Sequence, residues 1–218
     1  MDSTIIDGVL IKCLGNSGFM IKGNGMVIYI DPTNISTKVP EEDMADLLLI
    51  THEHFGHCDP ESIRNVRRFD CTTLIPEKMS LQFRGDARRI IEGDSLIGEL
   101  NIKGVDIEVV SAYESCDDIN SSGDGVGYFF TFAGLNIYHA GHTCALPEVK
   151  ISNLDIAFLP IAGHGVMDEA TAANAVSLLS PKTVVPMAYG PDHFDGASAD
   201  MFIDMVKQKS PSTRVVIL

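Results

Sequence analysis

The order of the apolar runs restricts the fold of this chain more than any other feature of its sequence. Runs of strand length, separated by Gly, Asn and Asp, follow one another from Val9 to His139. Such spacing is typical of hairpins and meanders. Strand-like runs then alternate with two helical patterns, "MDEATAANAVSLLS" and "ASADMFIDMVKQK", as in βαβ units. This order predicts an α/β fold in which two sheets pack together between outer helices.

Several local patterns add detail to this architecture. The runs "VLIKCL", "FMIKG" and "MVIYID", joined by "GNSG" and "GNG", predict an antiparallel meander. The run "ADLLLI" is typical of a strand buried on both faces. Asp59 followed by Pro60 has the form of a helix N-cap, so we expect a short helix over "ESIRNVRRF". We expect a further strand over "SLIGELNIK".

Length and charge limit the classes of function. A chain of 218 residues without a linker or repeat predicts one domain over residues 1–218. The net charge of −14 disfavours partners that are nucleic acids or anionic membranes, and favours a small-molecule substrate or ligand. We find no apolar run of about 18 residues and no secretory pattern, so we expect a cytoplasmic protein. The five scattered cysteines predict reduced thiols rather than a disulfide framework.

Three histidines lie within "THEHFGHCDP", directly after the apolar run. His52 and His54 are two residues apart in a loop that leaves a strand, a spacing that suits one zinc ion, and His57 is within reach of the same point. The alternative is a solvated loop whose histidines cap the following helix. A zincin motif is excluded because Gly56 stands where its second histidine would be.

The other histidines also follow strand-like runs. His142, His164 and His193 lie in three further loops just past such runs, where binding sites of layered α/β proteins occur. His139 lies within the strand-like run "LNIYHAG", and we assign it to the core. The loop histidines are therefore candidates for metal binding or proton transfer.

Four segments of the chain resemble a known family. The segments "GNSGFMIKGNGMVIYIDP", "LLLITHEHFGHCDP", "GVGYFFTFAGLNIYHAGHT" and "DIAFLPIAGHGVMDEATAANAVSLLSPKTVVPMAYG" are similar, in that order, to those of the metallo-β-lactamase superfamily. They are most similar to the small metal-dependent hydrolases related to ascorbate-6-phosphate lactonase. The resemblance implies an αββα four-layer sandwich, one or two metal ions at the sheet edges, and hydrolysis.

The same resemblance shows where the ligand set is degenerate. The family loop H-x-H-x-D-H has Gly56 here in place of its aspartate. Asn120 and Ala188 stand where the family has histidines, and His142 replaces a bridging aspartate. These changes imply the loss of one half of a binuclear site. Glu114, Asp59 and Asp192 are candidate partners of the remaining histidines.

Two hypotheses of function follow. In the first, at most one zinc ion per chain is held by His52, His54 and His142, and hydroxide attacks an ester, lactone or phosphoester with reduced or altered activity. His57 or His164 would then transfer the proton as the catalytic residue. In the second, the chain is an inactive pseudoenzyme or ligand-binding protein without metal. The sequence leaves open the roles of His193, Glu114 and Asn120, the substrate and the oligomeric state.

Overall fold

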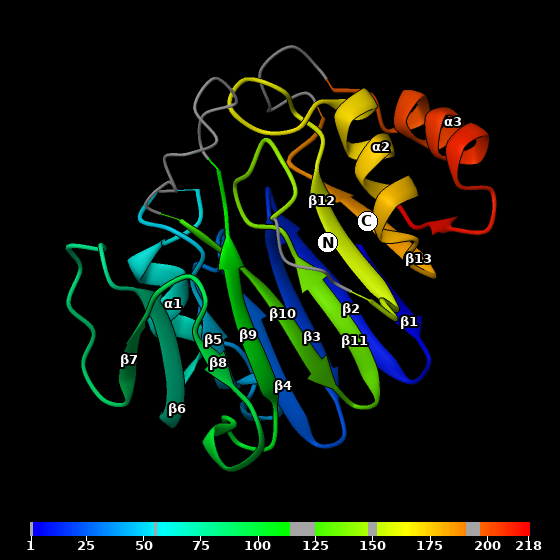
Figure 1. Ribbon diagram of the computed structural model, residues 1–218. Coiled ribbons are helices and arrows are strands. Elements are labelled where there is room, and N and C mark those ends of the chain that lie inside the picture. The colour runs from blue at the N-terminus through cyan, green and yellow to red at the C-terminus, as the bar shows by residue number, and fades with distance from the viewer. Residues whose placement is uncertain (1, 55, 114–124, 148–151, 191–196) are drawn as a thin grey trace.

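Two seven-stranded sheets lie face to face, with helices on their outer sides, in the computed structural model of the chain (Figure 1). The structure describes residues 2–54, 56–113, 125–147, 152–190 and 197–218. This is the αββα sandwich that the order of the apolar runs predicts. One helix covers the first sheet and two helices cover the second.

The first sheet contains the strands of the N-terminal part in sequence order. Its strands are β1 (Ser3–Ile6), β2 (Val9–Gly15), β3 (Gly18–Gly23), β4 (Met26–Ile30), β5 (Ala45–Leu49), β6 (Arg67–Pro76) and β7 (Ala87–Ile90). Strands β1 to β4 form an antiparallel meander, whereas β4, β5, β6 and β7 are parallel. Parallel pairing of β4 and β5 places their carboxyl ends side by side, and this edge carries the histidine loop.

The second sheet contains the remaining strands in reversed order. Its strands are β8 (Ser95–Leu96), β9 (Asp106–Ser111), β10 (Val126–Phe132), β11 (Leu135–His139), β12 (Ile156–Pro160), β13 (Thr183–Met187) and β14 (Arg214–Val215). Strands β8 to β11 are antiparallel, and β11 to β14 are parallel. The late βαβ pattern of the sequence therefore corresponds to the parallel half of this sheet.

Each helix begins at a side-chain cap that the sequence carries. Asp59 caps α1 (Pro60–Val66), Asp168 caps α2 (Glu169–Leu179), and Ser198 caps α3 (Ala199–Lys209) by accepting hydrogen bonds from backbone amides of the first turn. Two short 3₁₀ turns lie at Glu41–Asp43 and Gly98–Leu100. The predicted N-cap at Asp59 is confirmed.

Apolar side chains of both sheets interlock in one core. Ile21 and Leu47 of the first sheet, and Ile137 and Phe158 of the second, are completely buried in the same cluster. Burial of residues of this size stabilises each by about 1.5–3 kcal/mol. A second cluster packs α1 against the outer face of the first sheet, with Val66 fully buried. The strand ends are therefore held on a rigid double layer.

Three elements differ from the sequence-based prediction. The helix predicted over residues 61–69 ends at Val66, because Arg67 already pairs with Ala45 as the start of β6. The strand predicted over residues 95–103 is wrong beyond Leu96. Gly98 adopts a φ of 60° there and begins a 3₁₀ turn. Strand β1, over "STII", was not predicted at all.

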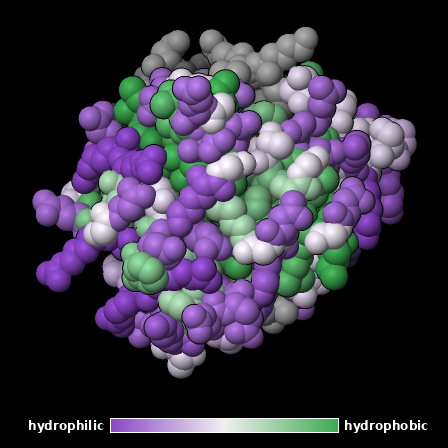
Figure 2. Space-filling model, turned by 90° about the horizontal axis from the view of Figure 1, so that it is seen from below, coloured by the Kyte–Doolittle hydropathy of each residue, from purple (hydrophilic) through white to green (hydrophobic). Residues whose placement is uncertain are grey.

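The surface shows both hydrophilic and apolar regions. The face seen from below in Figure 2 is mainly hydrophilic on its left side, and apolar side chains appear between hydrophilic ones on its right. Within the described parts of the chain, no helix has the length and apolar character needed to cross a membrane.

Candidate metal centre

Four strands deliver polar side chains to one edge of the sandwich. Asp31 follows β4, and His52 and His54 follow β5. From the second sheet, His142 follows β11 and His164 follows β12. Because the ends of packed strands meet at the same edge, residues far apart in the sequence form one site.

The histidine rings cluster tightly. The centroid of the His52 ring lies 4.0 Å from that of His57, 5.2 Å from that of His142 and 5.9 Å from that of His54. Ligand nitrogens of His52, His54 and His57 all lie within 4.8 Å of one another. Two nitrogens bound to one zinc ion at about 2.0–2.1 Å can be at most about 4.2 Å apart. Small side-chain rotations would therefore bring nitrogens of this cluster within the distance at which two of them can share one ion.

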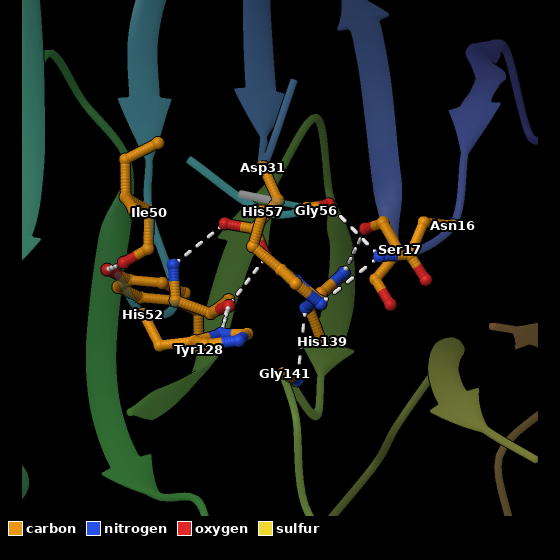
Figure 3. A network of polar contacts seen from close by, with 11 residues as sticks. Asn16, Ser17, Asp31, Ile50, His52, Gly56, His57, Tyr128, His139 and Gly141 are labelled. Carbon is orange, nitrogen blue, oxygen red and sulfur yellow. Dashed lines mark hydrogen bonds and ion pairs between the residues drawn. The ribbon is translucent and has the colours of Figure 1, made fainter. Parts of the chain in front are cut away.

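A buried carboxylate, Asp31, orients two of these rings (Figure 3). Its side chain is fully buried and accepts hydrogen bonds from the backbone N–H of Thr51 at 2.8 Å and from the Thr51 hydroxyl at 2.5 Å. Because that hydroxyl donates to Asp31, it accepts from Nδ1–H of His52, 2.9 Å away. The other nitrogen of His52, Nε2, thereby keeps its lone pair for a ligand.

Asp31 also holds His57. Nδ1–H of His57 donates to Asp31 at 2.8 Å, and Nε2 of the same ring lies 3.2 Å from Nδ2 of Asn16. The Asn16 amide group also donates to the backbone oxygen of Gly56 at 3.0 Å. Metal-binding histidines commonly donate their second nitrogen to a carboxylate in this way, which fixes ring and tautomer. His57 differs from His52 because Asn16 already contacts its outer nitrogen.

The environment lowers the pKa of two of these imidazoles, those of His52 and His142. Burial, reinforced by the neighbouring His57, lowers the pKa of His52 to about 3. Burial also lowers the pKa of His142. Burial raises the pKa of Asp31, and the hydrogen bonds from Thr51 oppose that rise. A neutral imidazole is the form that binds a metal, so this environment suits metal binding.

The histidines open on a cleft of about 370 Å³. It is lined by His54, His57, His142 and His164, together with Asn16, Ser17, Gly141, Pro160, Ala162, Gly163, Val166 and Ala188. The side chains of His54 and His142 have no hydrogen-bond partner among the described residues. A cleft of this size accommodates a small molecule. The structure therefore brings together all five of the predicted site histidines.

The backbone around this cleft is unusually strained. Asn16, Asp31, His164 and Ala188 have φ values of 49°, 43°, 51° and 55°. Residues other than glycine rarely adopt this left-handed region, and such residues cluster at functional sites. Seven further non-glycine residues with positive φ stand at other positions of the described chain, so this strain accompanies the cleft but is not confined to it.

His139 belongs to the core, as the sequence predicts. It is fully buried, donates from Nε2 to the backbone oxygen of Ser17 at 3.0 Å, and accepts at Nδ1 from the N–H of Gly141 at 3.2 Å. Both ring nitrogens are thus used inside the protein. Burial lowers its pKa to about 4.

Sequence reasoning missed three residues of the site. Asp31 follows the apolar run "MVIYI" just as the histidines follow theirs, and this position was the signal that could have identified it. Thr51 and Asn16 carried no comparable signal, since "GNSG" reads as a plain hairpin turn. Asp59, expected as a possible histidine partner, is instead the N-cap of α1.

The remaining candidate residues do not add to the site as described. Glu114, Asn120, Asp192 and His193 lie outside the described residues. Cys58 is buried, and burial raises the pKa of its thiol to about 12, so it is a spectator rather than a nucleophile.

Comparisons with known proteins agree with this fold. The sequence model described as "Beta-lactamase superfamily domain" matches residues 10–188. A UPF0173 metal-dependent hydrolase of Thermococcus kodakarensis is 36% identical over 199 residues, covering 83% of this chain and 84% of the relative. A second, from Thermococcus onnurineus, is 32% identical over 220 residues and covers 96% of both chains.

A solved structure of a similar protein has the same fold. Igni18, described as a novel metallo hydrolase from Ignicoccus hospitalis, superposes with a TM-score of 0.75 at 27% identity, covering 96% of this chain and 94% of that one. Fold, histidine cluster and relatives together define the class of protein. The chain belongs to the metallo-β-lactamase superfamily and, within it, to the UPF0173 family of metal-dependent hydrolases.

Proposed function

We propose that the protein is a single-metal hydrolase of small esters, lactones or phosphoesters, with lower activity than a binuclear relative. The observation that carries the proposal is the arrangement around Asp31. This one buried carboxylate orients His57 directly and His52 through Thr51, beside a cleft lined by His54 and His142. A buried carboxylate that fixes histidines in one tautomer is typical of metal sites.

The ligands that we propose are His52, His54 and His142, with zinc as the ion. His57 is nearer to His52 than His142 is, but both of its ring nitrogens already make hydrogen bonds. His142 has no such partner among the described residues, and burial keeps it neutral. Three imidazoles and one open position form a ligand set of the catalytic zinc type. Gly56 and Ala188 provide no side-chain donor for a second ion.

When bound, a zinc ion would polarise a substrate oxygen and lower the pKa of a coordinated water toward about 7. The residues of the chain would supply the remaining functions. Asp31 and Thr51 hold one ligand ring, that of His52, in position, so this ring needs little reorganisation when substrate enters. His164 lines the cleft and would move a proton between water and leaving group, whereas His57, with both ring nitrogens hydrogen-bonded, would orient groups beside the ion. The small cleft would limit the substrate to a small molecule.

Hydrolysis assays on zinc-loaded and chelated protein test this proposal. We expect zinc-dependent turnover of one ester, lactone or phosphodiester class, well below the usual enzymatic rate of about 10 per second. The activity should be lost in His52→Ala and in His142→Ala. Turnover that persists after chelation would contradict the proposal. Zinc binding without any turnover would favour the alternative, a pseudoenzyme that retains the cleft for ligand binding.

A further inference from the structure

The hairpin turn between β2 and β3 is fixed against the candidate metal centre at several points. The buried backbone oxygen of Ser17 accepts from His139 at 3.0 Å, and the backbone oxygen of Asn16 accepts from the N–H of Ala188 at 3.1 Å. Gly18 packs so closely that an added Cβ would lie 2.6 Å from the backbone oxygen of Asp31. The turn "GNSG" is therefore part of the site, and Asn16 is held in one place.

The hydrogen bonds of Asn16 define which atom faces His57. Nδ2 of Asn16 lies 3.0 Å from the Gly56 oxygen and 3.2 Å from Nε2 of His57. A backbone oxygen can only accept, so the atom between them is the amide nitrogen. Nε2 of His57 must then be the acceptor, which agrees with Nδ1–H donating to Asp31 at 2.8 Å. The lone pair that a metal would need is thus occupied.

Gly56 leaves the space that the Asn16 amide occupies in this arrangement. A Cβ at residue 56 would lie 2.9 Å from Nδ2 of Asn16, closer than real Cβ contacts. Any larger residue, including aspartate, would push the amide away from His57. Ala188, the other position without a ligand side chain, touches the backbone of Asn16. Asn16 therefore lies between the two positions at which a second metal would lose its ligands.

We propose that Asn16, packed against Gly56, donates a hydrogen bond to Nε2 of His57. This hydrogen bond keeps His57 from coordinating the metal. This inference rests on the proposed function, because it assumes an ion on the other histidines. Asn16 is then a positioning residue. It reserves His57 as a neutral hydrogen-bonding group beside the ion and restricts the cleft to a single metal.

Zinc titration of the metal-free full chain tests the proposal. In Asn16→Ala the hydrogen bond from Asn16 to Nε2 of His57 is lost, so we expect the dissociation constant of zinc to fall at least tenfold as His57 joins the other nitrogens. The gain should vanish in the double variant Asn16→Ala/His57→Ala. Asn24→Ala is the matched control, because Asn24 occupies the next hairpin turn with a φ of 50°, against 49° for Asn16, and is exposed. It should bind zinc as the wild type does.

A second measurement needs no metal. Gly56→Ala should lower the urea midpoint of the wild-type chain, and this loss should largely disappear in an Asn16→Ala background. An equal fall of the urea midpoint in both backgrounds would show that the Asn16 side chain does not pack against Gly56. If the wild type binds one zinc ion and Asn16→Ala binds it no more tightly, this proposal is wrong while the proposed function stands. If no form binds zinc, both are wrong.

Discussion

Acidification should destabilise the metal-free protein through His139. This ring is fully buried, and its Nδ1 accepts from the N–H of Gly141, so a proton at Nδ1 would face another donor. Burial lowers its pKa to about 4, against about 6.5 in an unfolded chain. Between these values the unfolded chain binds a proton that the folded chain does not, so stability falls as the pH falls below 6.5 and the loss levels off below about 4.

The lowered pKa of His139 sets the size of the effect. At pH 5 the loss from His139 alone is about 2 kcal/mol relative to pH 8, and it approaches about 3 kcal/mol below pH 4. Such a loss is a large fraction of the stability of a typical domain, about 5–15 kcal/mol.

Urea denaturation at several pH values, with chelator present, measures this loss. His139→Gln, which cannot titrate, is expected to be less stable at pH 8. Its stability should fall by about 2 kcal/mol less than that of the wild type between pH 8 and pH 5. Parallel pH profiles of wild type and variant would refute the assignment of the loss to His139.

Three further predictions concern Asp31, Gly141 and Cys58. Asp31→Asn should weaken zinc binding by about 10–100-fold, measured by competition with a chromophoric chelator, because the orienting carboxylate is lost. Gly141→Ala should lower the free energy of unfolding by about 1–3 kcal/mol more than Gly134→Ala does. Both glycines have positive φ, but only at Gly141 would a Cβ lie 2.5 Å from a backbone oxygen, that of Val126, whereas the space at Gly134 is open. Cys58 should react with a thiol reagent only on unfolding, since its pKa is raised to about 12 in the buried site; rapid reaction in the native state would contradict its burial.

The architecture could be predicted from sequence because each element carries its own pattern. Turn residues at fixed spacing mark the meander of β2, β3 and β4, and the caps Asp59 and Asp168 mark where helices begin. The prediction of element boundaries was wrong where pairing with a distant strand decides between helix and strand. Arg67 leaves the helical pattern because β5 offers it a partner strand, and nothing near it in the sequence reports that partner.

The site could be predicted only in part, for a similar reason. Histidines after strand-like runs indicated the edge at which they meet, since chain order suffices for that inference. The partners of these histidines could not be found in this way. Asp31 and His57 are separated by 26 residues and Asn16 and Gly56 by 40, and their hydrogen bonds exist only when the loops pack together. In the sequence, Gly56 indicates only a missing ligand. In the structure, the side-chain amide of Asn16 packs against it.

Metal content per chain tests the central claim most directly. The protein should be purified without a chelator or a nickel column, supplied with zinc, dialysed and measured by elemental analysis, beside His52→Ala and the control Asn24→Ala. We predict one zinc ion per chain in the wild type and in Asn24→Ala, and none in His52→Ala. Two tightly held ions per chain, none at all, or an unchanged content in His52→Ala would contradict a single-metal centre built on His52.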